Sequence, residues 1–180
     1  QEWKMKNFNK SSIILMLLCL TFSCKKDVVP GTSIKSETDN VIYGDPLKIE
    51  ITKNENSVMT IHADTLIRAN GGNTTLFGRI YADLFDKKGV KSSMMYSDSA
   101  IVYTNSDSIK AFGNVLIESL KGYRLLTSEI VLFNNSNLVK SNSDVIFTSN
   151  NNDTLYGTGF WSNFDMSNSQ IQSPKGSMSK

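Results

Sequence analysis

The sequence contains few of the residues on which catalysis and metal binding usually depend. Its 180 residues include one histidine, His62, and two cysteines, Cys19 and Cys24. A zinc site or a general base needs partner groups, and none is at hand for His62, which we assign to structure or surface. Aspartates recur near turns but form no calcium-loop motif. We expect no catalytic residue, no metal and no cofactor.

The chain also lacks a surplus of basic residues. It carries 19 Lys and Arg against 17 Asp and Glu. The surplus lies within residues 1–23, where three lysines oppose Glu2, so 16 basic residues face 16 acidic ones from Cys24 onward. Binding to a phosphate backbone needs clustered Lys and Arg. Nucleic acid is therefore excluded as an expected partner.

No apolar run is long enough to span a bilayer. Residues 13–22 contain a single polar position, and about 20 apolar residues are needed for a spanning helix. Two lysines precede this run, a pattern typical of a secretory signal. The run ends in T-F-S-C at 21–24, which resembles a bacterial lipobox whose cysteine, Cys24, is lipidated and becomes the first mature residue. The alternatives are ordinary cleavage near Ser23 or a buried anchor helix.

These features divide the chain into three parts. Residues 1–23 are the expected lipoprotein signal peptide, residues 24–44 are the lipidated Cys24 with a flexible linker, and residues 45–180 are the folded domain. The linker is rich in Lys, Ser, Thr, Pro and Gly. Because Cys19 is removed with the signal, no disulfide forms and the domain depends on its core. We expect a folded domain tethered to a membrane.

What the sequence does contain is a repeat of about 30 residues. Residues 97–119 align without a gap on residues 127–149. Each copy has an apolar, β-branched run, a polar turn of Asn, Ser or Asp, and a second apolar run, which predicts two antiparallel strands. The 24 Ser and 18 Asn of the chain supply many such turns. No window has helical spacing with a capping box, so we expect an all-β domain.

The alternation along the strands predicts one apolar face. Odd positions from Ile109 to Ile117 share a face, as do those from Val139 to Phe147. Such a face must be covered, as in a sandwich, a jelly roll or an open V-shaped pair of sheets. Its small members are Ala111, Gly113, Ser141 and Ser143. They indicate either an incompletely filled interior that admits a guest, or a bulge at the glycine and serines near a sheet edge.

Three short segments carry a resemblance to a known family. They are residues 96–103, residues 112–115 with the repeat that follows, and L-Y-G-T-G-F at 155–160, which resembles a Gly-x-Gly turn before closing strands. Over roughly residues 45–176 the chain resembles the LptC family, whose repeat is shared with LptA and the N-terminal domain of LptD. The resemblance implies a twisted, open β-jelly roll built from antiparallel strand repeats. Better-known members carry a transmembrane helix where this chain has a lipobox.

The resemblance also implies a function in transport. The protein would accept lipopolysaccharide from an inner-membrane ABC transporter and pass it to a periplasmic LptA-like bridge protein, with anchoring in the inner membrane favoured. A groove lined from alternate strand positions would shield acyl chains, which otherwise expose methylenes at about 0.8 kcal/mol each. The candidate lining residues are Ile109, Val115, Ile117, Val131, Phe133, Val139, Val145 and Phe147. Their alternative role is an ordinary dry core.

A second hypothesis is a surface lipoprotein whose β-repeat domain binds glycan or serves structurally. Phe160 and Trp161 after Gly159 suggest a platform for sugar stacking, although aromatic residues at a strand end are also common in cores. A motif of Asp, Ser or Thr, and an apolar residue resembles the O-glycosylation signal of some diderm bacteria, and strands that start after Asp-rich turns produce the same letters. The motif begins at Asp64, Asp98, Asp107 and Asp153.

Overall fold

The computed structural model describes residues 39–69 and 72–176, and β-strands make up most of them. Helical structure in this part of the chain is confined to one short 3-10 turn, η2 (Thr104–Ser106). The expected all-β domain is therefore confirmed. The strands are β1 (Asp39–Lys53), β2 (Asn56–Ala69), β3 (Thr74–Phe85), β4 (Lys91–Tyr103), β5 (Ser108–Ser119), β6 (Arg124–Phe133), β7 (Leu138–Thr148), β8 (Thr154–Asn163) and β9 (Ser169–Lys175).

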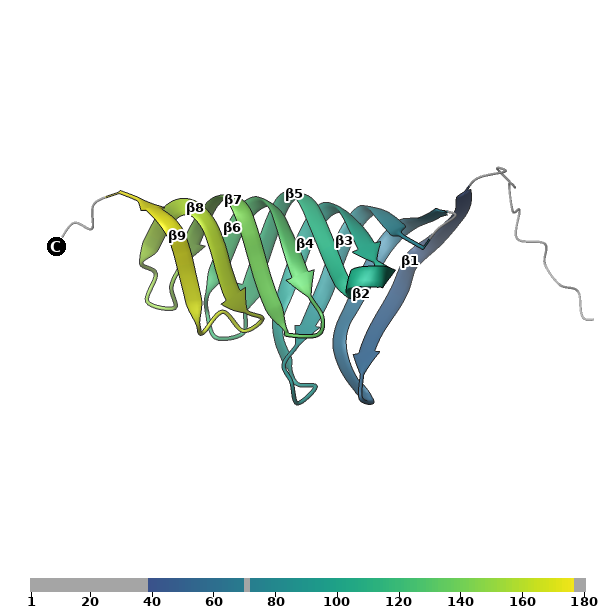
Figure 1. Cartoon of the computed structure of the whole chain (residues 1–180), viewed down its shortest axis with the longest axis horizontal. Helices are drawn as coiled ribbons and strands as arrows, with labels where there is room; N and C mark the ends of the chain where they lie inside the picture. Colours follow the sequence, from purple (N-terminus) through teal and green to yellow (C-terminus); the bar gives the residue numbers. More distant parts are fainter. Residues whose placement is uncertain (1–38, 70–71, 177–180) are drawn as a thin grey trace, which may run out of the picture. The chain divides into compact units, whose positions relative to one another are not determined.

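The strands form one antiparallel sheet in which every strand pairs with its neighbours in sequence. Figure 1 shows them following one another in chain order, from the blue β1 to the yellow β9. The sheet is open because β1 and β9 are its two edges. The hairpin β4–β5 and the hairpin β6–β7 correspond to the two copies of the repeat. This arrangement agrees with the open β-jelly roll that the resemblance implies.

A line of irregular pairing crosses the sheet near the middle of its strands. Seven successive strand pairs, from β1–β2 to β7–β8, each contain a register shift there, such as the one between Phe112 and Val115 in β5–β6. Gly78 and Gly113 lie on this line with φ of 92° and 71°, a conformation that other residues seldom adopt. Bulges of this kind bend strands and increase their twist. We call these positions the bulge line.

Bending at the bulge line brings the two ends of the strands together. The turns β1–β2, β3–β4, β5–β6 and β7–β8 lie at one margin of the sheet, and the alternate turns lie at the other. Asn137, in the β6–β7 turn, nevertheless donates from Nδ2 to the carbonyl oxygen of Phe85 at the far end of β3, over 2.8 Å. A straight strand of 12 residues would hold the margins about 40 Å apart. The two halves of the sheet therefore face each other.

The core lies between these two halves. In β5 the side chains of Ile109 and Ala111, before the bulge line, and of Val115 and Ile117, after it, are all fully buried. Strand β7 repeats the pattern, so the expected odd-numbered faces of both strands point inward. An apolar face is buried only where a second layer covers it. In this domain the second layer is the other half of the same sheet.

Two sequence expectations about boundaries differ from the structure. Strand β1 begins at Asp39, inside the segment 24–44 that the sequence suggested as a linker, because it pairs with the end of β2. The segment 155–160 is not a turn but part of β8. A Cβ on Gly157 would come within 2.7 Å of a carbonyl oxygen of β9, and Gly159 has a φ of 77°. These glycines allow close strand approach and bending instead of reversing the chain.

The role of the bulge line can be tested at Gly113. A Cβ on Gly113 would lie 3.0 Å from Asp98 Cβ and against its carboxylate, which accepts a 2.8 Å hydrogen bond from Asn114. We expect Gly113→Ala to lower the free energy of unfolding by about 2–4 kcal/mol, from backbone strain and loss of this contact. The measurement is equilibrium unfolding in urea.

Gly122 provides the matched control, because its φ is also positive, at 88°, while its added Cβ would meet nothing closer than Asn150 Cβ at 3.5 Å. Gly122→Ala should therefore cost only the backbone term, about 1 kcal/mol. If both variants lowered the free energy of unfolding equally, crowding at the bulge line would contribute nothing to the loss of stability in Gly113→Ala.

Candidate functional site: the apolar interior of the bent sheet

The candidate site is the apolar interior between the two halves of the sheet. Its aromatic residues form a chain of ring contacts: Phe147 lies 5.4 Å from Phe160 and stacks on Tyr123 at 5.9 Å between centroids. Within the described residues, the buried side chains are apolar apart from Ser, Thr and Asn, and none is charged. Such an interior accepts hydrocarbon and provides no group for acid–base or nucleophilic chemistry.

Six of the eight predicted lining residues face this interior, and all six are buried. They come from β5 and β7, on both sides of the bulge line. Their exposed fractions run from 0% for Val115 to 7% for Phe147. They pack in one continuous cluster, so in the closed structure they form a core, and their contact with lipid stays a prediction. The six are Ile109, Val115, Ile117, Val139, Val145 and Phe147.

The other two predicted lining residues lie on the outer face, so their inward placement was wrong. Val131 is half-buried and Phe133 is 37% exposed, whereas Ile130 and Leu132 beside them belong to the core. The cause is the long register shift in β6–β7 that begins after Thr127. Across this shift β6 advances from Thr127 to Val131 while β7 covers one residue more, from Lys140 to Val145. Because side chains alternate, this difference of one residue moves the inward positions of β6 from odd to even numbers.

Polar contacts join the two margins of the sheet in two places, and we call the line where they meet the seam. At the first contact, Lys53 Nζ donates to the carbonyl oxygen of Asn135 over 3.0 Å, and Asn137 Nδ2 donates to that of Phe85. The second contact involves the β8–β9 turn, residues 164–168. The interior is thus enclosed by the bend on one side and by the seam on the other.

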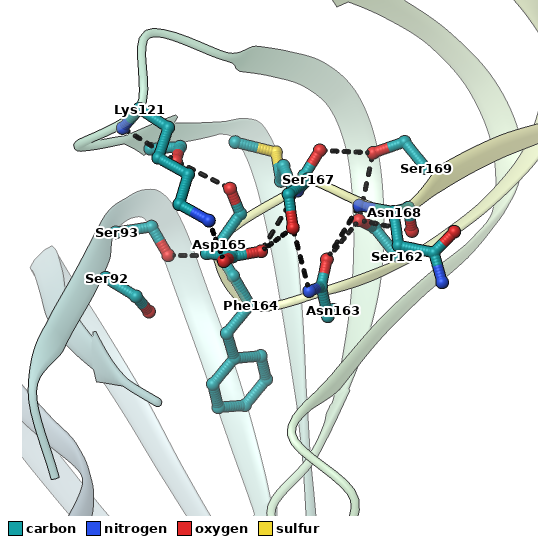
Figure 2. Close-up of polar contacts among 12 residues, drawn as sticks. Ser92, Ser93, Lys121, Ser162, Asn163, Phe164, Asp165, Ser167, Asn168 and Ser169 are labelled. Atoms are coloured by element: carbon teal, nitrogen blue, oxygen red, sulfur yellow. Dashed lines mark hydrogen bonds and ion pairs between the residues drawn. The ribbon is translucent and has the colours of Figure 1, made fainter. Parts of the chain in front are cut away.

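Two serines, Ser93 and Ser119, hold the β8–β9 turn at the seam. Figure 2 shows Ser93 beside Phe164 of this turn. Ser93 Oγ donates to the carbonyl oxygen of Phe164 over 2.5 Å, and Ser119 Oγ donates to that of Asp165 over 2.6 Å. The serines are register partners in β4 and β5. Lys121 adds an ion pair to Asp165, with Nζ and Oδ2 2.6 Å apart. The turn is therefore fixed to strands four positions away in the sheet.

Sequence reasoning missed the two apolar residues of this turn. Phe164 and Met166 are 1% and 0% exposed and belong to the core cluster. In Figure 2 the Phe164 ring points away from the polar contacts of the turn. Turns are usually polar and lie at the surface. The available signal was the segment N-F-D-M-S-N at 163–168, in which two large apolar residues alternate with polar ones inside a turn.

The ion pair at the seam shifts the pKa of both partners. Burial alone would raise the pKa of Asp165, but hydrogen bonds from Lys121 and Ser167 outweigh it and hold that pKa below its usual range. The hydrogen bond to Asp165 in turn raises the pKa of Lys121. Both groups are therefore charged at neutral pH, and the contact is complete there.

The remaining residues that the sequence singled out are dispersed. Half-buried His62 lies with its ring 5.7 Å from that of Tyr81. Two of the Asp motifs, at Asp64 and Asp98, lie on the bulge line and not at strand starts. There the backbone N–H of Arg79, with its guanidinium, lowers the pKa of Asp64. These contacts point to a structural role for the mid-strand aspartates.

Some expectations fall outside the described residues. Cys24 and the expected signal lie there, so the lipid anchor stays a prediction. No helix between residues 39 and 176, apart from the two residues left undescribed, is long and apolar enough to cross a membrane. In the same ranges, no group of three or more His, Cys, Asp or Glu is placed to hold a metal ion.

An open antiparallel sheet bent around an apolar interior defines the class of open β-jelly rolls. Comparison with known proteins narrows this class: the family described as "Lipopolysaccharide-assembly, LptC-related" matches residues 12–174. The chain belongs to the LptC family. Its function accordingly lies in lipopolysaccharide transport in the periplasm, as a transport component and not as a member of a known enzyme family. No curated protein matches the chain.

The two faces of the sheet can be distinguished by truncation. Ile117→Ala removes a fully buried side chain and should lower the free energy of unfolding by about 2–5 kcal/mol. Phe133→Ala removes an outer-face ring and should cost about 1 kcal/mol or less. Urea unfolding of both variants measures the difference. A loss at Phe133 as large as that at Ile117 would place its ring in the interior after all.

The ion pair at the seam predicts a pH dependence. Because the pKa of Asp165 is lowered by folding, its stabilisation is present above the unfolded pKa, near 3.9, and is lost as the pH falls through the folded value. We expect the wild type to melt at a higher temperature than Asp165→Asn at pH 7. The difference should shrink as the pH falls below about 4 and vanish below the folded pKa of Asp165. A difference that persists in acid would contradict a role for the charge.

Proposed function

We propose that this protein is the membrane-anchored periplasmic component of a lipopolysaccharide export machine. It accepts lipopolysaccharide from an inner-membrane ABC transporter and passes it to a periplasmic LptA-like bridge protein. The observation that carries the proposal is the apolar interior of a single open sheet, free of buried charge within the described residues. Membership of the LptC family indicates that the cargo is lipopolysaccharide.

The interior suits a cargo that must be shielded without being held in one pose. Each methylene kept out of water is worth about 0.8 kcal/mol, and this stabilisation has no preferred direction. Val115 on β5, with Val145 and Phe147 on β7, offers such contacts at successive positions. An acyl chain can therefore shift from one contact to the next with little change in free energy.

The edge strands are suited to contact neighbouring β-domains. Strands β1 and β9 each have one side without a partner strand in this sheet, and such edges recruit strands from other chains. Each carries one proline, Pro46 or Pro174, which removes a backbone donor and restricts the pairing register. We propose that the transporter and the bridge protein attach at these two edges.

The anchor completes the proposal. Lipidation of Cys24 would leave 14 residues before β1 begins at Asp39, which reach about 45 Å when extended. The domain would then stay near the inner membrane, where the transporter delivers its cargo. Acyl chains on a cysteine provide this anchoring through the same burial of methylenes.

The glycan-binding alternative has less support from the geometry. Phe160 is fully buried and cannot stack on a sugar. Trp161 is half-buried, and its indole N–H is already donated to Gln170 Oε1 over 3.0 Å. The two aromatic residues that suggested a sugar platform therefore belong to the core and to the β8–β9 pairing.

Photo-crosslinking tests the proposed cargo. Benzoylphenylalanine in place of Phe147, which lies in the interior, should form adducts with lipopolysaccharide in living cells after irradiation. The same group in place of Phe133, on the outer face, should form few or none. Both substitutions replace one phenylalanine by the same larger side chain. They therefore differ mainly in whether that side chain faces the interior or the outer face. The readout is an anti-lipopolysaccharide blot of the purified protein.

Depletion of the protein provides an independent readout. We expect lipopolysaccharide to accumulate at the inner membrane when the protein is withdrawn. Adducts at neither position, together with normal lipopolysaccharide delivery after depletion, would contradict the proposed function and favour the structural or glycan-binding lipoprotein.

A further inference from the structure

The β8–β9 turn fills part of the interior with its own side chains. Phe164 and Met166 are buried in the core although they lie in a turn. Together they occupy about the volume of ten methylenes. They sit where the seam closes, between the turn and the ends of β4 and β5. The space in which an acyl chain would rest is thus already occupied by groups of similar size and polarity.

Few polar contacts hold this turn to the opposite margin. They are the hydroxyl of Ser93, the hydroxyl of Ser119 and the ammonium group of Lys121. The serine hydroxyls donate to backbone carbonyl groups, so they bind the turn whatever side chains it carries. Each such hydrogen bond contributes only about 1 kcal/mol in net terms. The attachment is specific in geometry but modest in strength.

The turn keeps its own shape through internal contacts. Met166 N donates to the carbonyl oxygen of Asn163 over 3.0 Å, and Asn168 N donates to Asn163 Oδ1 over 3.1 Å. Asp165 accepts hydrogen bonds from Ser167 N and Oγ at 3.0 and 2.7 Å. These contacts stay intact if the turn moves as a unit. Displacement would therefore break the contacts to β4 and β5 without unfolding the turn.

Two further features favour movement. Met166 has a φ of 56°, which is uncommon for a residue other than glycine and persists only where the surroundings enforce it. Strand β9, which follows the turn, is the short edge strand, and most of its residues are exposed. An edge strand with few buried groups opens more readily than the centre of a sheet.

We propose that Phe164 and Met166 form an internal plug that occupies an acyl-chain site in the ligand-free protein, and that a fatty acyl chain of the cargo displaces it. The chain enters across the seam, between the β8–β9 turn and the ends of β4 and β5. This inference rests on the proposed function and adds where the cargo enters and what it replaces. The exchange is one apolar group for another, so neither state leaves the interior empty.

A pocket of about 330 Å³ lies on the seam beside Phe164, among the β3–β4, β6–β7 and β8–β9 turns. It is lined by residues of both margins, among them Phe164, Asn137 and Lys87. Asn137 also accepts a hydrogen bond from Phe164 N over 3.1 Å. The pocket gives an acyl chain a place to begin replacing the plug.

The double variant Ser93→Ala and Ser119→Ala tests the plug. It removes both hydroxyl donors and leaves Phe164, Met166 and the interior unchanged. If the closed turn competes with the cargo, weakening it raises apparent affinity, because the competent fraction grows. With benzoylphenylalanine at Phe147 in the full chain in cells, we expect the yield of lipopolysaccharide adducts to rise several-fold, up to about tenfold.

The matched control is Ser97→Ala with Ser108→Ala. These serines are also buried, at 7% and 5% exposure, but their hydroxyl groups contact Ser99 and Ser106 and not the turn. Their adduct yield should equal that of the wild type. A yield that is equal in all three backgrounds would overturn the plug while leaving the proposed function standing. Absence of adducts in every background would overturn both.

Hydrogen exchange of the unmodified chain gives a second measurement that does not depend on the variants. Addition of lipopolysaccharide should speed exchange at the amide of Phe164, which donates to Asn137 outside the turn, relative to the amides of β4 and β5. The amides of Met166 and Asn168 donate to Asn163 within the turn and should change less. Slower or unchanged exchange in the turn, while the interior of the sheet becomes more protected, would show that the cargo binds without displacing it.

Discussion

The structure depends on one constraint: a single sheet must cover its own apolar face. Strands of ten residues or more with inward-facing Ile, Val and Leu cannot remain flat in water, and within the described residues no helix or second sheet covers them. The bulge line solves this by bending successive strands at one place. Gly113 allows the backbone to bend there, and Asp98 beside it accepts a hydrogen bond from the side-chain amide of Asn114. The interior and the seam both follow from that bend.

The seam relates stability to function. A closed interior is needed because exposed apolar side chains would destabilise the domain and promote association. An interior that opens is needed if acyl chains are to pass. In the proposed function the seam meets both demands, because few polar contacts close it, including those of Ser93 and Asn137 to backbone carbonyl groups. Contacts of this kind define the closed position clearly but contribute little free energy individually, so a cargo with many methylenes can outweigh them.

Parts of this description could be predicted from the sequence. The repeat of residues 97–119 on 127–149 predicted the β4–β5 and β6–β7 hairpins, and the alternation in β5 predicted that Val115 and Ile117 point inward. The same alternation failed for Phe133, because an irregularity inside β6 reverses the face and leaves no clear mark in the sequence. The Gly-x-Gly segment failed as a turn, because a glycine that allows bending looks the same as one that reverses the chain.

The sequence by itself determined the all-β class, the strand repeats and most of the apolar face, because these depend on local patterns of period two. It also carried enough of the family's pattern to place the chain among LptC proteins. Only the tertiary structure decided which turns of the two margins meet each other. It also decided that Phe164 lies inside the core. Contacts between residues 71 positions apart depend on the angle of the bend and on the twist that accumulates over several strands. Both are properties of the whole sheet, and no local segment encodes them.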